Sequence, residues 1–133
     1  MPQSYSLNAI VLKTYNVGEA DRYCVLFTRE RGRLAVRAAG VRKTTSRMGG
    51  SLLMPRHVQI TVKESSAGWI AANVQVIDTH TETIDPSAFA DVAEGIEVLL
   101  RLTQDDEPLP RVFDATLEFL RSCRRHHYSS PPG

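Results

Sequence analysis

The sequence predicts a mainly β protein with helices at its C-terminal end, and two observations carry this prediction. Five segments before Asp78 have strand composition or alternate in hydrophobicity with a period of two, and beyond Asp78 the period becomes that of a helix. The chain has 133 residues, 42% of them hydrophobic and 23% charged, which suffices for one core of ordinary size. We therefore expect one main domain with an appendage.

Three strands are predicted in the N-terminal part. Residues 9–12 are apolar throughout and form a short run, as in a strand that is buried on both faces. Residues 22–29 are rich in β-forming side chains and end in a turn that contains a glycine. In residues 33–39 apolar side chains alternate with Arg33 and Arg37, so one face of this strand belongs to the core and the other is cationic.

The last two predicted strands form a hairpin. Val58, Ile60 and Val62 alternate with polar residues, which is the clearest period of two in the chain. A turn at 65–68 then leads into a fifth strand, 69–77. In this strand we expect an inward-facing set, Ile70, Ala72, Val74 and Val76, and an outward-facing set, Ala71, Asn73 and Gln75.

Five strands with a long connection between the third and the fourth predict the closed Greek-key barrel called the OB-fold. A sandwich of two sheets fits the same pattern and stays open. The barrel is our prediction, followed by about two α-helices.

Both helices have recognisable starts. Asp85 is a cap residue followed by a proline, and apolar residues recur from there at helical spacing to about Thr103. A second helix begins around Pro110, with acids at 105–107 before it and with basic residues in its last turns, as the helix dipole favours: Arg121, Arg124 and Arg125. Two short helices cannot enclose a core, so we expect them to pack on the barrel, on each other or on another molecule.

The predicted organisation has three parts. Residues 1–80 form an OB-fold domain that binds nucleic acid, residues 81–127 form a truncated helical appendage, and residues 128–133 form a disordered tail.

The charge of the chain is divided between its halves. Residues 1–63 hold 11 Lys/Arg and 3 Asp/Glu, a net charge of +8, whereas residues 64–133 hold 5 and 12, a net charge of −7. The overall charge of +1 conceals this asymmetry, which points to a basic face that binds nucleic acid or another polyanion. The alternative is that these cations only solvate exposed strand faces.

Gly40–Arg56 is the clearest candidate for a nucleic-acid contact. It has no acidic residue, contains small hydrogen-bonding residues and a pair of glycines, and carries four cations, Arg42, Lys43, Arg47 and Arg56. Together with Arg33 and Arg37 on the outer barrel face, these residues are predicted to neutralise phosphates. Six contacts correspond to a log–log salt slope of about −4 on single strands.

Three aromatic residues are available to stack on bases: Tyr15, Tyr23 and Trp69. Trp69 is included in the predicted DNA site. For each ring, packing within the barrel is the favoured interpretation, because the chain is only 7% aromatic.

Other functional classes find little support in the residues. The chain contains no phosphate-binding loop, no HExxH motif and no plausible catalytic triad, so we expect no enzyme, cofactor or metal. Cys24 and Cys123 are predicted to be reduced thiols, and Cys123 with His126 and His127 matches no structural zinc spacing. Residues 18–21 are interpreted as a turn rather than as a metal site or an acid–base pair, and Asp21 and Arg22 are expected to help fix the neighbouring basic loop. No signal peptide or membrane span is apparent, which predicts a cytoplasmic protein.

Four motifs, in their order and spacing, resemble the N-terminal part of the bacterial recombination mediator family RecO. The resemblance covers about residues 5–77 and is weaker through the helices. The motifs are Ala9-Ile10-Val11-Leu12, Gly18-Glu19-Ala20-Asp21-Arg22, Leu26-Phe27-Thr28-Arg29-Glu30-Arg31-Gly32 and Gly40-Val41-Arg42-Lys43-Thr44-Thr45-Ser46-Arg47-Met48-Gly49-Gly50.

The resemblance implies an OB-fold that binds single- and double-stranded DNA and anneals complementary strands. It also implies that, with its partner RecR, the protein helps to load RecA onto DNA coated by single-strand-binding protein. Typical members continue into a longer helical domain, which carries the contact with single-strand-binding protein in some of them. Because this chain stops after about two helices, DNA binding is a firmer expectation than loading that depends on partners.

A second hypothesis uses the same residues. The chain could be a protein-interaction adaptor that receives an acidic protein tail on its basic face and another partner on its acidic helices. DNA binding should weaken steeply with salt, whereas a peptide groove should depend on one or two apolar contacts.

Overall fold

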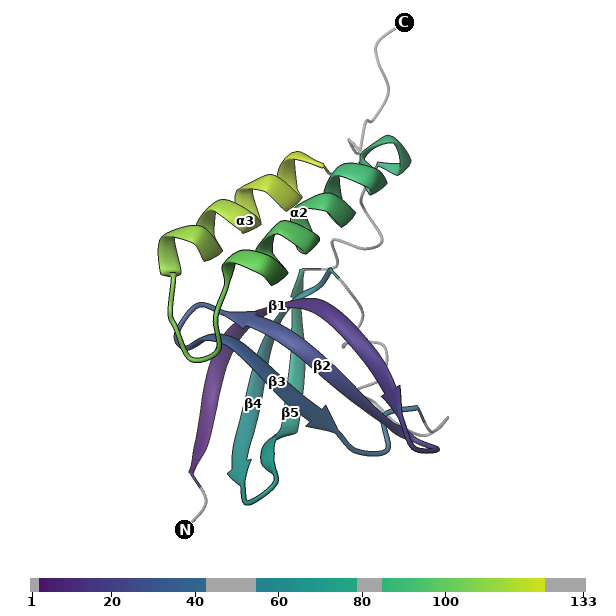
Figure 1. Cartoon of the computed structure of the whole chain (residues 1–133), viewed down its shortest axis with the longest axis vertical. Coiled ribbons are helices and arrows are strands. Elements are labelled where there is room, and N and C mark those ends of the chain that lie inside the picture. Colours follow the sequence, from purple (N-terminus) through teal and green to yellow (C-terminus); the bar gives the residue numbers. More distant parts are fainter. Residues whose placement is uncertain (1–2, 43–54, 79–84, 124–133) are drawn as a thin grey trace, which may run out of the picture.

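The computed structural model describes residues 3–42, 55–78 and 85–123 of the chain. The described residues form five strands followed by a short 3₁₀ helix and two α-helices (Figure 1). In chain order these elements are β1 (Ser4–Val17), β2 (Asp21–Thr28), β3 (Gly32–Ala38), β4 (His57–Ser65), β5 (Gly68–Asp78), η2 (Pro86–Ala88), α2 (Phe89–Leu102) and α3 (Pro110–Ser122). The predicted tail at 128–133, like Arg124 and Arg125, lies outside the described residues.

The strands close into a barrel in the order β1-β2-β3-β5-β4, and β4 pairs with β1 to complete it. All neighbouring strands are antiparallel except β3 and β5, which run parallel. A five-stranded barrel with this order is the OB-fold, so the predicted fold is confirmed and the sandwich is excluded.

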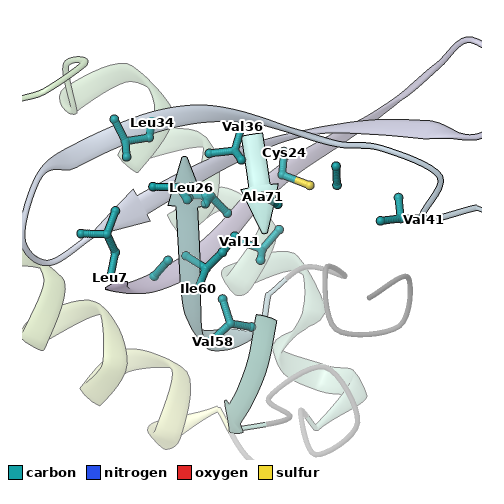
Figure 2. Packing of buried hydrophobic residues seen from close by; sticks show 13 residues of the cluster. Leu7, Val11, Cys24, Leu26, Leu34, Val36, Val41, Val58, Ile60 and Ala71 are labelled. Carbon is teal, nitrogen blue, oxygen red and sulfur yellow. The ribbon is translucent and has the colours of Figure 1, made fainter. Parts of the chain in front are cut away.

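The barrel encloses one hydrophobic cluster (Figure 2). In β3 the buried residues are Leu34, Val36 and Ala38, as the alternation predicts. In β4 the three predicted apolar residues, Val58, Ile60 and Val62, are all fully buried. These regular strands supply the interior because successive side chains of a strand point to opposite faces.

The fifth strand corrects a prediction. Ala71, expected outside, is 7% exposed and belongs to the core, whereas Ile70, expected inside, is 38% exposed, and Ala72 is also exposed. The cause is a bulge: Thr61 pairs with Asn73 but Val62 pairs with Ala71, so one extra residue separates them. An extra residue reverses which side chains face inward, because the period of a strand is two.

β1 is buried on both faces, as predicted. Ala9 and Val11 point into the barrel, while Ile10 and Leu12 belong to a second hydrophobic cluster on its outer side. This second cluster contains Phe27 of β2 and the buried side of the helices, namely Val92, Phe113, Leu117, Leu120 and Cys123. The two helices therefore pack on the barrel and on each other. In Figure 1 they lie side by side above β1.

The helix starts agree with prediction in part. The carboxylate of Asp85 accepts a hydrogen bond from the backbone N–H of Ser87 at 3.0 Å, and Pro86 follows it in η2. Phe89, which lies among the apolar residues at helical spacing in this helix, is 55% exposed, and the buried residue of α2 is Val92.

A close approach joins the barrel to the helix pair at the turn between β2 and β3. Gly32 has a φ of +72°, a left-handed conformation that other residues adopt at a cost. A Cβ atom at Gly32 would also collide with the backbone of Glu107 in the connection between α2 and α3, with the Glu107 nitrogen 2.8 Å away. Only glycine satisfies both conditions.

Gly32→Ala should therefore destabilise the protein by at least about 3 kcal/mol, because it adds a backbone collision to an unfavourable φ. Gly18→Ala is the matched control: its φ is +59°, but a Cβ there meets nothing within 4 Å. We expect this control to cost only about 1 kcal/mol. Urea unfolding of both variants measures the difference, and equal losses would show that the helix connection does not constrain the turn.

Candidate nucleic-acid interface

Three arginines at the turn between β2 and β3 form ion pairs with aspartates of the helical part. The distances between the paired nitrogen and oxygen atoms are 3.0 Å for Arg29–Asp114, 3.3 Å for Arg31–Asp106 and 3.0 Å for Arg33–Asp105. The hydrogen bond from Arg29 holds the pKa of the Asp114 carboxyl below its ordinary value. Basic residues of the first half therefore meet acidic residues of the second half within one molecule.

Among the predicted site residues, Arg33 takes part in these contacts with the helical part through both its side chain and its backbone. Its Nε donates to Asp105 and its Nη1 donates to the carbonyl of Leu100 at 2.7 Å, and its side chain is 25% exposed. The backbone carbonyl of Arg33 also accepts from the N–H of Asp106 at 3.1 Å. Its guanidinium thus fastens the helix connection to β3.

These contacts change the interpretation of the charge asymmetry. Part of the positive charge of residues 1–63 is compensated by acids of residues 64–133 rather than presented to a ligand. The acids at 105 and 106, which the sequence suggested as partners of a helix dipole, instead pair with arginines of the barrel.

A second cluster gathers around Asp21, at the opposite end of β2. One oxygen of Asp21 accepts two hydrogen bonds from Arg37, at 2.7 and 3.0 Å, and the other accepts from the backbone N–H of Gly40 at 2.8 Å. Asp21 therefore holds the start of the basic segment against the barrel, as predicted for this residue.

Arg42 belongs to the same cluster. Its Nε donates to the backbone carbonyl of Asp21 at 3.1 Å and its Nη2 donates to the carbonyl of Gly18. Both acceptors are neutral, so these contacts position the guanidinium without cancelling its charge. Since a guanidinium has five N–H donors, capacity for a phosphate remains.

The rest of the predicted basic loop is only partly described. Lys43 and Arg47 lie outside the described residues. Arg56 is half-buried, and its backbone carbonyl accepts from the N–H of Val11 at 3.0 Å, which ties the end of the segment to β1.

The ring of Trp69 is in contact with two neighbouring side chains. Its ring packs edge-on against Tyr5 with 5.6 Å between centroids, and the Arg31 guanidinium lies 5.0 Å from the Trp69 centroid and 4.9 Å from that of Tyr5. Packing, the interpretation favoured for this ring, accounts for its surroundings. The involvement of Tyr5 and Arg31 was not foreseen, because no sequence periodicity links them to Trp69.

The cysteines are buried, free thiols, and burial raises the pKa of Cys24 to about 11. A thiol with this pKa is protonated at neutral pH and is a poor nucleophile. Within the described ranges no group of three or more His, Cys, Asp or Glu residues could hold a metal ion, while His126 and His127 lie beyond them. None of the helices seen in these ranges is long and apolar enough to cross a membrane.

An apolar cavity of about 540 Å³ opens between α2 and α3. Its walls include Ile10 and Leu12 of β1, and its rim includes exposed apolar residues of both helices, Val98, Leu102, Val112 and Phe119. Among the residues that the structure describes, the charged ones in its lining are the acids Asp91 and Glu94. This groove is a second candidate binding surface.

Comparison with known proteins identifies the family. Residues 1–74 match the family described as Recombination protein O N terminal. Three curated relatives, each named DNA repair protein RecO, are similar to the chain. The relative from a Nocardioides species is 44% identical over 82 residues, covering 62% of this chain and 31% of its own length. The Myxococcus xanthus relative is 34% identical over 113 residues, covering 84% and 46%, and the Heliobacterium modesticaldum relative is 34% identical over 109 residues, covering 76% and 37%.

The chain thus spans less than half the length of each of these three relatives. The family match extends through β1 to β4 and most of β5, the strands that close the barrel. The chain belongs to the RecO family of DNA repair and recombination proteins and contains the family's N-terminal OB-fold.

Proposed function

We propose that this protein binds DNA, single- and double-stranded, at the end of its OB barrel where the basic segment 40–56 begins. The observation that carries the proposal is the Asp21 cluster, which anchors Gly40 and Arg42, the start and the first cation of an acid-free segment. Membership of a DNA repair family supports the same ligand. Binding is proposed to rest on phosphate contacts and so to have little sequence preference.

The proposed residues differ in whether they would contact DNA phosphates directly. Arg42, Lys43 and Arg47 are the principal phosphate contacts, and Arg37 and Arg56 support them from the two ends of the segment. Arg33 acts indirectly, because its guanidinium is held by Asp105 and Leu100.

The proposed biological role follows from the family. The protein would anneal complementary strands and, with RecR, aid the loading of RecA onto DNA coated by single-strand-binding protein, in the bacterial cytoplasm near the nucleoid. It would do so by binding, without catalysing a covalent step.

The first test is a salt series with a labelled single strand of ~30 nucleotides, followed by fluorescence anisotropy. The triple variant Arg42→Ala, Lys43→Ala, Arg47→Ala should bind more weakly and flatten the log–log salt slope by about 2, since each phosphate contact contributes roughly 0.7.

The control for this experiment removes the same charge elsewhere. The triple variant Arg101→Ala, Arg111→Ala, Arg121→Ala changes the net charge equally but alters only the helices. It should keep the wild-type slope. If both triple variants lost affinity equally, net charge rather than the basic segment would explain binding, and a folded wild type that bound no DNA at low salt would refute the proposal.

A separate prediction concerns Arg33. Arg33→Ala should lower stability by roughly 1–2 kcal/mol, because it leaves the Leu100 carbonyl without its donor, yet change DNA affinity less than twofold. Arg42→Ala should do the reverse, with the larger effect on affinity. Urea unfolding and anisotropy measurements on the two variants distinguish a structural role from DNA contact. A large loss of DNA affinity in a stably folded Arg33→Ala protein would show that Arg33 contacts DNA directly.

The groove between α2 and α3 favours a second candidate function, that of a protein-interaction adaptor. Because the charged residues of its lining are acids, the occupant we propose is an amphipathic helix with an apolar face and basic flanks. An acidic protein tail fits this groove poorly.

A synthetic Leu/Lys helix of roughly 18 residues is a suitable probe, with its Leu/Glu counterpart as control. We expect only the Leu/Lys peptide to bind, and the double variant Val98→Lys, Leu102→Lys to weaken binding at least about tenfold, since both side chains are exposed on the rim. Equal binding of the two peptides, or unchanged binding by the variant, would exclude the groove. Isothermal titration calorimetry provides the measurement.

A further inference from the structure

The outer face of the barrel carries a row of aromatic and basic residues on three adjacent strands. Tyr15 of β1 is directly opposite Tyr23 of β2, and Tyr23 is directly opposite Arg37 of β3. Residues in such register lie side by side on one face, with Cβ atoms about 5 Å apart for each pair. The next residues along, Cys24 and Val36, are buried inside the barrel, so the row points outward.

The helix pair covers only one part of this outer face. Ile10, Leu12 and Phe27 lie under the helices, whereas Tyr15 is 47% exposed and the Arg37 side chain 45%. In Figure 1 the ends of β1 and β2 that join through their turn extend away from α2 and α3. A substantial aromatic surface is therefore open to a ligand at this end.

Cations flank the two tyrosines on both sides. The Lys13 ammonium lies 5.0 Å from the centroid of the Tyr15 ring, and contact with Tyr15 holds the pKa of Lys13 above its ordinary value. On the other side Arg37 contacts Asp21, which also positions Gly40 and Arg42. The row is thus continuous with the start of the basic segment.

Trp69 offers a poorer stacking surface. Its ring is already covered by Tyr5 and by the Arg31 guanidinium, which itself pairs with Asp106. A base on the face beside Arg31 would have to displace a guanidinium that is also paired with Asp106.

We propose that Tyr15 and Tyr23 form a stacking platform for unpaired bases, with Lys13 and Arg37 contacting the flanking phosphates. The proposal rests on the proposed DNA-binding function and assigns the side chains that would contact the unpaired bases of a single strand. Duplex DNA gains nothing from the platform, because its bases already stack on one another. The basic segment then contacts the phosphates of both single-stranded and duplex DNA, and the tyrosines add affinity only for the single strand. Arg37 is paired with Asp21, so a phosphate would share its guanidinium with that carboxylate.

The test compares three probes of equal length: oligo(dT), an abasic strand with the same backbone, and a duplex. Tyr15→Ala and Tyr23→Ala should each weaken binding to oligo(dT) by about fivefold or more, the lower end of what stacking one base contributes. Binding to the abasic strand and the duplex should not change, and the salt slope should stay that of the wild type. Tyr15→Phe and Tyr23→Phe keep the rings and should bind like the wild type.

Several results would overturn the platform. If the alanine variants lost affinity equally for the abasic strand, the tyrosines would serve the backbone site rather than stack on bases. If oligo(dT) binding were unchanged, no stacking would occur there. Should Tyr23→Ala fail to fold, Tyr15→Ala decides the question, because nearly half of that side chain is exposed. Wild-type protein that binds none of the three probes would instead refute the proposed function itself.

An independent readout comes from Trp69, the single tryptophan of the chain. As oligo(dT) binds the wild type, tryptophan emission should stay nearly constant while anisotropy rises. Strong quenching that persists in Tyr15→Ala would move the stacking site to Trp69.

Discussion

The helix pair is seated on the outer face of β1, and most other features of this protein depend on that contact. A strand that is apolar on both faces needs a second layer, and α2 and α3 supply it through the cluster around Phe27 and Phe113, whose rings lie 5.7 Å apart. The position of this layer then decides which part of the barrel surface remains open. It also brings the helix connection against Gly32 and the arginines beside it.

That seating has an electrostatic consequence. Each of the ion pairs between the β2–β3 turn and the helical part is partly solvent-exposed, and such pairs contribute little to stability individually. Their larger effect is on the field of the molecule, because they cancel charge at one end of the barrel. At the other end Arg42 is held by neutral carbonyl groups. At that end Arg37 is paired with Asp21, whereas the charge of Arg42 is not cancelled by its contacts.

The regular parts of the fold were predictable because they follow simple periods. The alternation in β3 and β4, the two-faced burial of β1 and the cap at Asp85 each depend on residues close in sequence. The bulge in β5 was not predictable, since one alanine among several small residues leaves no mark on composition.

Within the site, the role of Asp21 could be anticipated from its place in a turn. The pairing of Arg33 with Asp105 could not, because it joins residues brought together only by the tertiary fold. The opposite net charges of the two halves are consistent with ion pairs between them, but a basic face that binds a ligand predicts the same charge distribution.

The proposed arrangement would separate two kinds of recognition along one surface. Phosphate contacts need cations, and the segment between β3 and β4 carries Arg42, Lys43, Arg47 and Arg56 without an acidic residue. Base stacking needs rings held in fixed orientation, which suits side chains on a closed barrel. Asp21 lies between the two, because it binds Arg37 beside the tyrosines through one oxygen and the start of the basic segment through the other. A strand annealing protein must hold a backbone while leaving the pairing edges of the bases accessible. Stacking on Tyr15 and Tyr23 would occupy the base faces and leave those edges free, so this geometry is compatible with annealing in a way that hydrogen-bonded base readout would not be.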